Sequence, residues 1–209
     1  MAVESLIFDI DGTLWDSRAL VAEGYAIQLR KEGLAHLCVT AEDLKPLFGK
    51  VMTQIADAIL APIPVPERYR LMERCMETEN RYLHENECAI GYAGVRQTLQ
   101  ELAKRYRLFI VSNSQCGYPE LCIRKLGLED VIEAHKCFGD TGTEKGETIR
   151  RLMAERHIQS AVDIGDTQGE LEAARAAGIG FIFAAYGFGD PDHWDARIEK
   201  VEDLLMIDI

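Results

Sequence analysis

The residues with the clearest chemistry are two aspartates that follow a short apolar segment near the start of the chain. Residues 5–10 read Ser-Leu-Ile-Phe-Asp-Ile, a pattern typical of a buried strand, and Gly12 ends it. Because side chains alternate in a strand, Asp9 and Asp11 share one face. Two charges roughly 4 Å apart repel by about 4 kcal/mol at an effective dielectric of about 20. A divalent cation, or a proton on one aspartate, would remove that repulsion.

Both solutions suit phosphoryl transfer. A carboxylate can attack phosphorus and form an aspartyl-phosphate, while a second, protonated carboxyl group gives its proton to the leaving oxygen. An ordinary turn is the alternative for the Asp11-Gly12 dipeptide taken alone, since Asp-Gly is common in turns.

The ten residues from Phe8, Phe-Asp-Ile-Asp-Gly-Thr-Leu-Trp-Asp-Ser, resemble the first motif of the haloacid dehalogenase (HAD) superfamily, in its phosphatase branch. The resemblance covers nearly the whole chain and is nearest to phosphoglycolate phosphatase-like proteins. It implies that Asp9 is the nucleophile and Asp11 the general acid/base, with Gly12 and Thr13 among the substrate-binding residues. Dehalogenases of the superfamily lack the second acid, so Asp11 argues against dehalogenation.

A second polar group, Ser112-Asn113-Ser114, follows the apolar segment 108–111. A hydroxyl, an amide and free backbone N–H groups ahead of a helix suit a phosphate, although Ser and Asn are also common in turns and helix caps. By the resemblance this is the second motif, which places Ser112 on the substrate phosphate and Asn113 beside it.

Lys145 opens a predicted helix over residues 145–157. A cation at a helix N-terminus is unfavourable for the helix dipole, so an anionic partner is expected, although a solvated surface lysine is the alternative. The resemblance makes Lys145 the third motif, a catalytic cation that holds the nucleophile and the phosphate. Many relatives have proline after this lysine where this chain has Gly146, and Lys136 is the alternative candidate.

The fourth polar group is the string Gly-Asp-Thr-Gln-Gly-Glu, which contains Asp166 and Glu170 and follows a predicted strand. The resemblance implies that Asp166 completes an Mg²⁺ site with the Asp9 carboxylate and the Asp11 backbone carbonyl. Glu170 stands where the family usually has aspartate, and we expect it in or next to the coordination sphere. Asp163, deeper in the strand, is expected to satisfy a neighbouring hydrogen bond instead.

The elements that must position these groups alternate between strand and helix after residue 91. This alternation predicts an α/β, Rossmann-like parallel sheet with helices on both faces, whose ligands bind beyond the carboxyl ends of the strands. Asp16-Ser17 can cap a helix that runs to about Glu32, and residues from there to about 87 are helical and interrupted by prolines. We therefore predict a core domain of residues 1–15 and 88–209 with an inserted helical domain of residues 16–87.

By the resemblance, the insertion is a helical (C1-type) cap that closes over the site. Within it, Phe48-Gly49-Lys50 is a glycine-containing turn that carries a cation. Lys50 is accordingly a candidate substrate-binding residue, and an ordinary turn between helices is the alternative.

Composition limits the partners. The chain has 209 residues, 47% of them hydrophobic, and a formal net charge of −12, which disfavours nucleic acid or an anionic membrane as a partner. Its six cysteines form no Cys-x-x-Cys pair, and Met1-Ala2-Val3-Glu4 lacks a signal-peptide pattern. These observations favour reduced thiols and a cytoplasmic protein, a monomer or homodimer that acts on a small phosphorylated metabolite.

The sequence thus predicts an Mg²⁺-dependent phosphatase that hydrolyses a small phosphate monoester through an aspartyl-phosphate. One alternative is a phosphoryl transferase similar to phosphoglucomutase, which would return the phosphoryl group to a sugar. The other is a non-catalytic regulator that binds metal or phosphate, suggested by Glu170.

Overall fold

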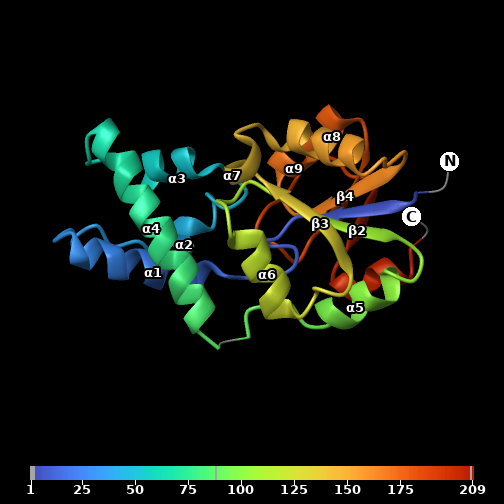
Figure 1. Cartoon of the computed structure of the whole chain (residues 1–209), viewed down its shortest axis with the longest axis horizontal. Helices are drawn as coiled ribbons and strands as arrows, with labels where there is room; N and C mark the ends of the chain where they lie inside the picture. The colour runs from blue at the N-terminus through green and yellow to red at the C-terminus, as the bar shows by residue number, and fades with distance from the viewer. Residues whose placement is uncertain (1–2, 88, 208) are drawn as a thin grey trace.

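The computed structural model describes residues 3–87, 89–207 and 209, and these build a parallel sheet covered by helices (Figure 1). The strand order is β3-β2-β1-β4-β5-β6. The strands are β1 (Ser5–Phe8), β2 (Arg107–Ser112), β3 (Ile132–Cys137), β4 (Ala161–Gly165), β5 (Gly180–Ala184) and β6 (Ala196–Ile198). All five pairings between neighbouring strands are parallel, which confirms the predicted fold class.

Alternating side chains of the central strands point to opposite faces of the sheet. Ile7 and Phe109 pack against α8 (Lys145–Glu155) and α9 (Gln168–Ala177). Leu6 and Phe8 belong to the larger apolar cluster on the other face, to which α5 (Val95–Leu102), α6 (Tyr118–Leu126) and the 3-10 helix η1 (Val201–Leu205) contribute. Both faces of β1 are therefore buried, as its continuous apolar sequence predicts.

A second group of helices lies beyond the carboxyl ends of the strands, on the left of Figure 1. It consists of α1 (Arg18–Lys31), α2 (Ala41–Leu44), α3 (Met52–Ile59) and α4 (Val65–Glu85). The helices α1 and α4 pack closely, because Gly24 lets the Glu79 backbone approach: a Cβ at residue 24 would lie 3.0 Å from the Glu79 Cα. We call these four helices the cap. The predicted domain boundaries stay a prediction, and residue 88 lies outside the described residues.

Several elements differ from the sequence-based expectations. The strand β1 ends at Phe8 and the helix α8 at Glu155, whereas the sequence predicts a strand over residues 5–10 and a helix over residues 145–157. The helix α7 (Phe138–Thr141), β6 and η1 were not predicted; each is a short element of three to five residues. Such lengths are too short for a hydrophobic period to register.

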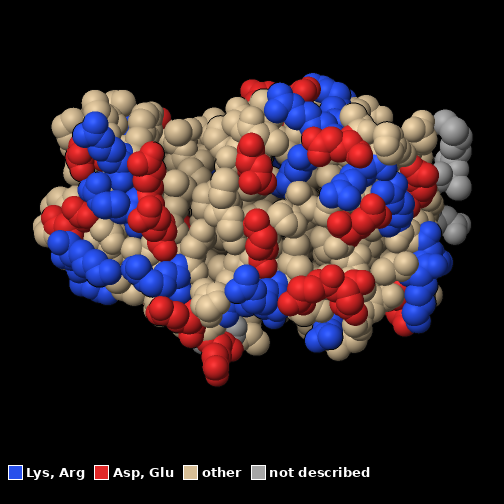
Figure 2. All heavy atoms as spheres, in the orientation of Figure 1, with Lys and Arg blue, Asp and Glu red and all other residues tan. Residues whose placement is uncertain are grey.

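None of the helices in the described part of the chain is long and apolar enough to cross a membrane. Figure 2 shows acidic and basic side chains interspersed over the face that carries α4, α6 and α8.

Candidate active site

The strand order brings three predicted motifs to one edge of the sheet. The strand β1 lies between β2 and β4, so the residues that follow these strands are neighbours. Asp9 follows β1 directly, and its N–H donates to the Ile164 carbonyl of β4 at 2.9 Å. Ser112 ends β2, and Asp166 follows β4. The direction of winding reverses at β1, which is where ligands bind in open α/β sheets.

Lys145 joins this group from the first position of α8. Its Nζ donates to Asp9 Oδ1 at 2.7 Å and to Glu170 Oε1 at 3.4 Å, and the residue is only 4% exposed. Burial lowers the pKa of Lys145, but the charges of Asp9 and Glu170 raise it by more than burial lowers it. The net pKa is raised, so the ammonium keeps its proton. Lys136, the alternative candidate, instead forms an ion pair with Glu155 at 2.9 Å. The anionic partner expected for Lys145 is therefore present.

Three carboxylates at this edge could hold a cation. Asp9, Asp166 and Glu170 each offer an oxygen, and the three atoms lie within 4.8 Å of one another. Asp166 Oδ2 accepts a hydrogen bond from the Phe188 N–H at 2.5 Å, whereas Oδ1 is buried and has no partner among the described residues. Burial and the charge of Glu170 raise the pKa of both aspartates. This set of oxygen donors fits a divalent cation such as Mg²⁺.

Glu170 has two separate contacts. Its Oε2 accepts from the N–H groups of Asp166 at 2.7 Å and Thr167 at 3.1 Å, and Oε1 faces Lys145. Glu170 is thus the acidic half of a capping box with Thr167 at the start of α9. The longer side chain folds back onto its own helix N-terminus, which leaves the other oxygen beside the cation ligands.

Gly12 and Thr13 form the turn after β1. Gly12 has φ +84°, and a Cβ there would lie 2.2 Å from Asp166 Oδ2, so only glycine lets the turn come this close to Asp166. Thr13 is fully buried, and its carbonyl accepts from the Tyr186 hydroxyl at 2.9 Å. These contacts show how the two residues shape the turn, and their contact with substrate stays a prediction.

Asp11 is held by a cluster of donors that the sequence analysis did not identify. Its Oδ1 accepts from Trp15 Nε1 at 2.9 Å, Ser17 Oγ at 2.8 Å and the Tyr118 hydroxyl at 2.8 Å. Burial raises the pKa of Asp11 to about 6, and these hydrogen bonds oppose the increase. Because the donors all bind Oδ1, Oδ2 is the oxygen that can carry a proton.

The cap predicted at Asp16-Ser17 is present only for Asp16, whose Oδ1 accepts from the Arg18 N–H at 3.2 Å at the start of α1. Ser17 precedes α1, but its side chain makes no capping hydrogen bond. The hydroxyl instead lies 2.8 Å from Asp11 Oδ1 and 2.7 Å from the Tyr118 hydroxyl. The carboxylate is a stronger acceptor than a neutral partner, and this interaction takes precedence over the helix terminus.

A cavity opens above these residues, between the cap and the sheet. The predicted residues Asp9, Asp11, Lys50, Ser112 and Asn113 all line it. On the cap side, its remaining lining residues include Val21, Tyr25, Phe48, Met52, Ile55 and Glu79.

Asn113 has a further contact that sequence reasoning did not anticipate. Its Nδ2 donates to the Gly49 carbonyl at 2.7 Å, so it joins the motif after β2 to the cap turn that carries Lys50. Ser112 Oγ accepts from the Ser114 N–H at 3.2 Å and lies in the cavity wall. The turn at residues 48–50 thus contacts the sheet edge and is more than a connection between helices.

The expectation for Asp163 is wrong. The residue is fully buried on β4, and neither carboxyl oxygen has a hydrogen-bond partner in the described part of the chain. Burial raises the pKa of Asp163 to about 7, while the nearby Lys145 charge opposes the increase. Asp163 is paired in register with Ile7 and lies on the face of the sheet that α8 covers. An isolated acid in an apolar strand was the only sequence signal for it.

Acids at the carboxyl edge of a parallel sheet, beneath a helical cap, indicate a capped α/β enzyme, and comparisons with known proteins identify its family. The family model described as "Haloacid dehalogenase-like hydrolase" matches residues 6–184. The chain therefore belongs to the haloacid dehalogenase-like hydrolase family.

Similar proteins span the chain. The pyrophosphatase PpaX of Listeria monocytogenes is 25% identical over 215 residues, covering 98% of this chain and 96% of the relative. A phosphoglycolate phosphatase of Xanthomonas campestris is 29% identical over 211 residues, covering 93% and 90%. Among solved structures, a putative phosphoglycolate phosphatase from Lactobacillus plantarum superposes with a TM-score of 0.82 at 21% identity, covering 99% of each chain. That likeness concerns the fold.

Proposed function

We propose that this chain is an Mg²⁺-dependent phosphatase that hydrolyses a small phosphate monoester through an aspartyl-phosphate on Asp9. The single observation that carries the proposal is the convergence of Asp9, Lys145, Asp166 and Glu170 on one point beneath a cavity that Asp11 also lines. Family membership and relatives named as phosphatases support the same reaction type.

In the first step a carboxylate oxygen of Asp9 attacks phosphorus, and the bond from phosphorus to the ester oxygen breaks. Lys145 holds Asp9 Oδ1, which fixes the rotation of the nucleophile and offsets the repulsion between a carboxylate and a phosphate dianion. The proton on Asp11 passes to the leaving oxygen, so the departing group is a neutral alcohol.

In the second step Asp11, now ionised, removes a proton from water, whose oxygen attacks the phosphorus of the aspartyl-phosphate. The acyl-phosphate bond breaks, inorganic phosphate leaves, and Asp9 and Asp11 return to their starting states. Ser112 and Asn113 in the cavity wall would hold the phosphate oxygens. The carboxylates of Asp9, Asp166 and Glu170, with the Asp11 carbonyl, would hold Mg²⁺, which neutralises charge on the phosphoryl group when bound.

The test is phosphate release from a panel of phosphorylated metabolites with Mg²⁺, without an activating bisphosphate. We expect turnover by the natural chain, loss of turnover on adding a chelator, and recovery on restoring Mg²⁺. Asp9→Asn should abolish turnover and leave the circular dichroism spectrum unchanged. Turnover by this variant would contradict the assignment of Asp9 as the nucleophile. Dependence on a bisphosphate would favour the transferase alternative.

The proposal includes the expected setting of the enzyme. We infer a cytoplasmic monomer or homodimer that acts on a small phosphorylated metabolite and needs neither nucleic acid nor membrane. The acidic net charge of −12 supports this choice of partner.

A further inference from the structure

The wall of the cavity contains a carboxyl group from the cap that the proposed reaction does not use. Glu79 of α4 is 3% exposed, and its Oε1 accepts from Gln115 Nε2 at 3.2 Å. Its Oε2 is buried and has no hydrogen-bond partner within 3.5 Å among the described residues, and the nearest donor is the Tyr25 hydroxyl, which lowers the pKa of Glu79. Buried polar atoms are nearly always paired, so an unpaired oxygen in a cavity wall indicates that a bound molecule supplies the partner.

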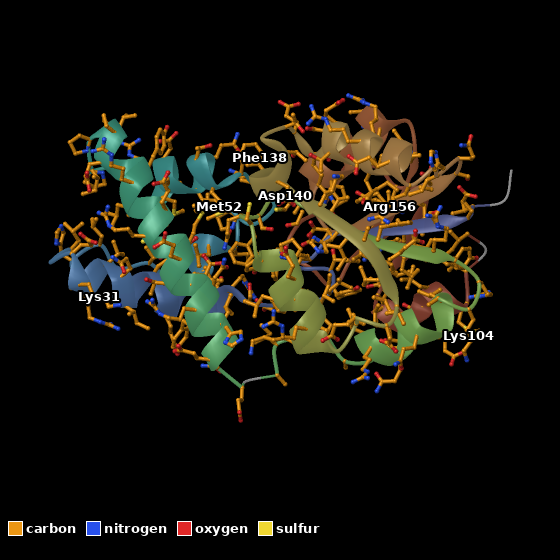
Figure 3. All side chains as sticks on the ribbon, in the orientation of Figure 1. Lys31, Met52, Lys104, Phe138, Asp140 and Arg156 are labelled. Atoms are coloured by element: carbon orange, nitrogen blue, oxygen red, sulfur yellow. The ribbon has the colours of Figure 1, made fainter. Side chains whose placement is uncertain are left out.

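The surroundings of Glu79 make it the main polar group on the cap side of the cavity. The side chains of Val21, Met52 and Ile55 are apolar, and Tyr25 lies next to Glu79. Figure 3 shows Met52, a lining residue of this cavity, on the side of the cap that faces the sheet domain. A small number of polar groups in an apolar pocket fix the orientation of a ligand. Glu79 is therefore placed to contact the leaving group of the substrate.

The charges around the cavity bear on the choice of leaving group. The lining contains three carboxyl groups, those of Asp9, Asp11 and Glu79, and one cation, the exposed Lys50. A leaving group with a carboxylate or a second phosphate would add negative charge to this predominantly acidic lining. Burial raises the pKa of Glu79 to about 8, so the group is mostly protonated at pH 7 and ionises at higher pH. A hydroxyl group can donate or accept and therefore pairs with either form.

We propose that Glu79 is a specificity-determining residue that hydrogen-bonds a hydroxyl group of the leaving alcohol, so that the preferred substrates are small hydroxylated phosphate monoesters such as phosphorylated polyols. This inference rests on the proposed phosphatase function and narrows it. The preferred substrates would then differ from those in the names of the relatives, phosphoglycolate and pyrophosphate, whose leaving groups are anionic.

The contact between the cap and the sheet edge agrees with a small substrate. The hydrogen bond from Asn113 to the Gly49 carbonyl draws the cap turn onto the sheet edge, which limits the length of the leaving group.

The experiment compares glycerol phosphate with propyl phosphate, which has the same carbon chain and no hydroxyl group. We expect Glu79→Leu to lower kcat/KM at least about tenfold for glycerol phosphate and to change it by less than about threefold for propyl phosphate. Glu79→Gln should stay within about threefold of the natural chain for both, because an amide also donates and accepts. Glu77→Leu, an exposed glutamate on the same helix, is the matched control and should change neither rate.

Equal losses on both esters would assign Glu79 a purely structural role and overturn the proposal. A natural chain that prefers phosphoglycolate or pyrophosphate to glycerol phosphate would also overturn it.

Binding measurements separate this inference from the phosphatase proposal. In Asp9→Asn protein, calorimetry should show tighter binding of glycerol phosphate than of propyl phosphate, and adding Glu79→Leu should remove the difference. This result would support the Glu79 contact even if the natural chain turned over no ester, an outcome that would reject only the phosphatase. Equal affinities in Asp9→Asn protein would overturn the Glu79 contact.

Discussion

Replacing Tyr118 with phenylalanine tests whether the donors around Asp11 set the protonation of the general acid. The Tyr118 hydroxyl donates to Asp11 Oδ1 at 2.8 Å, and this hydrogen bond lowers the pKa of Asp11 against the effect of burial. The ring also packs edge-on against Trp15, with centroids 5.4 Å apart, and phenylalanine keeps that contact. The change therefore removes the contacts of this hydroxyl with Asp11 and Ser17 and little packing.

The expected size follows from the strength of that bond. A hydrogen bond to a charged group contributes about 1.5–3 kcal/mol, and about 1.4 kcal/mol corresponds to one pKa unit. Because Ser17 and Trp15 still donate to the same oxygen, the lower end applies. The pKa of Asp11, about 6 in the natural chain, should rise by about one unit.

The assay is the pH profile of kcat/KM for an alkyl phosphate, followed by phosphate release. Free enzyme needs Asp11 protonated to deliver its proton, so kcat/KM falls as the pH rises through the pKa of Asp11. Tyr118→Phe should move this limb to higher pH by about one unit. The substrate titrates equally in both proteins, so the difference between the two profiles belongs to the enzyme.

Tyr186→Phe is the matched control for Tyr118→Phe. It removes a hydroxyl that donates to the Thr13 carbonyl at 2.9 Å, and its limb should not move. A limb for Tyr118→Phe that stays in place or moves to lower pH would refute the assignment of Asp11 as the proton donor.

Other predictions concern the cation site. Gly12→Ala should lower the free energy of unfolding by at least about 2 kcal/mol, because it combines a strained positive φ with a clash against Asp166. Thermal unfolding should show a Tm lower by roughly 4–8 °C, and an unchanged Tm would contradict the geometry. Lys145→Met should lower the free energy of unfolding in urea by about 3–5 kcal/mol, since it removes the cation that pairs with Asp9 and Glu170. Adding Asp9→Asn should recover part of this loss. Because the raised pKa values of Asp9 and Asp166 make the folded state bind more protons than the unfolded state, stability should fall as the pH rises above their unfolded values. The gain in Tm from Mg²⁺ should therefore be larger at about pH 7.5 than at about pH 5, and equal gains would contradict this coupling.

The sheet edge could be predicted from sequence because its signals are local. Each motif follows a run of apolar residues that forms a strand, and the alternation of strands with helices implies that those strands are parallel neighbours. Asp9, Asp166 and Lys145 are far apart in the chain, yet the topology alone brings them together. The predicted fold class was confirmed for the same reason.

The donors around Asp11 and the polar wall of the cap could not be predicted in this way. Tyr118 begins α6 and Glu79 lies in the middle of α4, and a tyrosine or glutamate at such positions is ordinary in a helix. Their importance depends on how two helices, α4 and α6, pack beyond the strand ends. No local pattern records that packing, and Ser17 was misassigned because a serine before a helix usually caps it.

Glu170 shows how one residue can satisfy a local rule and a site at the same time. The sequence analysis expected Glu170, where the family usually has aspartate, in or next to the coordination sphere of the cation. In the structure the longer side chain places Oε2 on the N–H groups of Asp166 and Thr167 and Oε1 beside Lys145. Those N–H groups belong to the loop that carries Asp166, so the carboxylate both begins α9 and fixes the position of a neighbouring acid. One carboxylate group at this position therefore caps the N-terminus of α9 and faces the Lys145 ammonium at the same time.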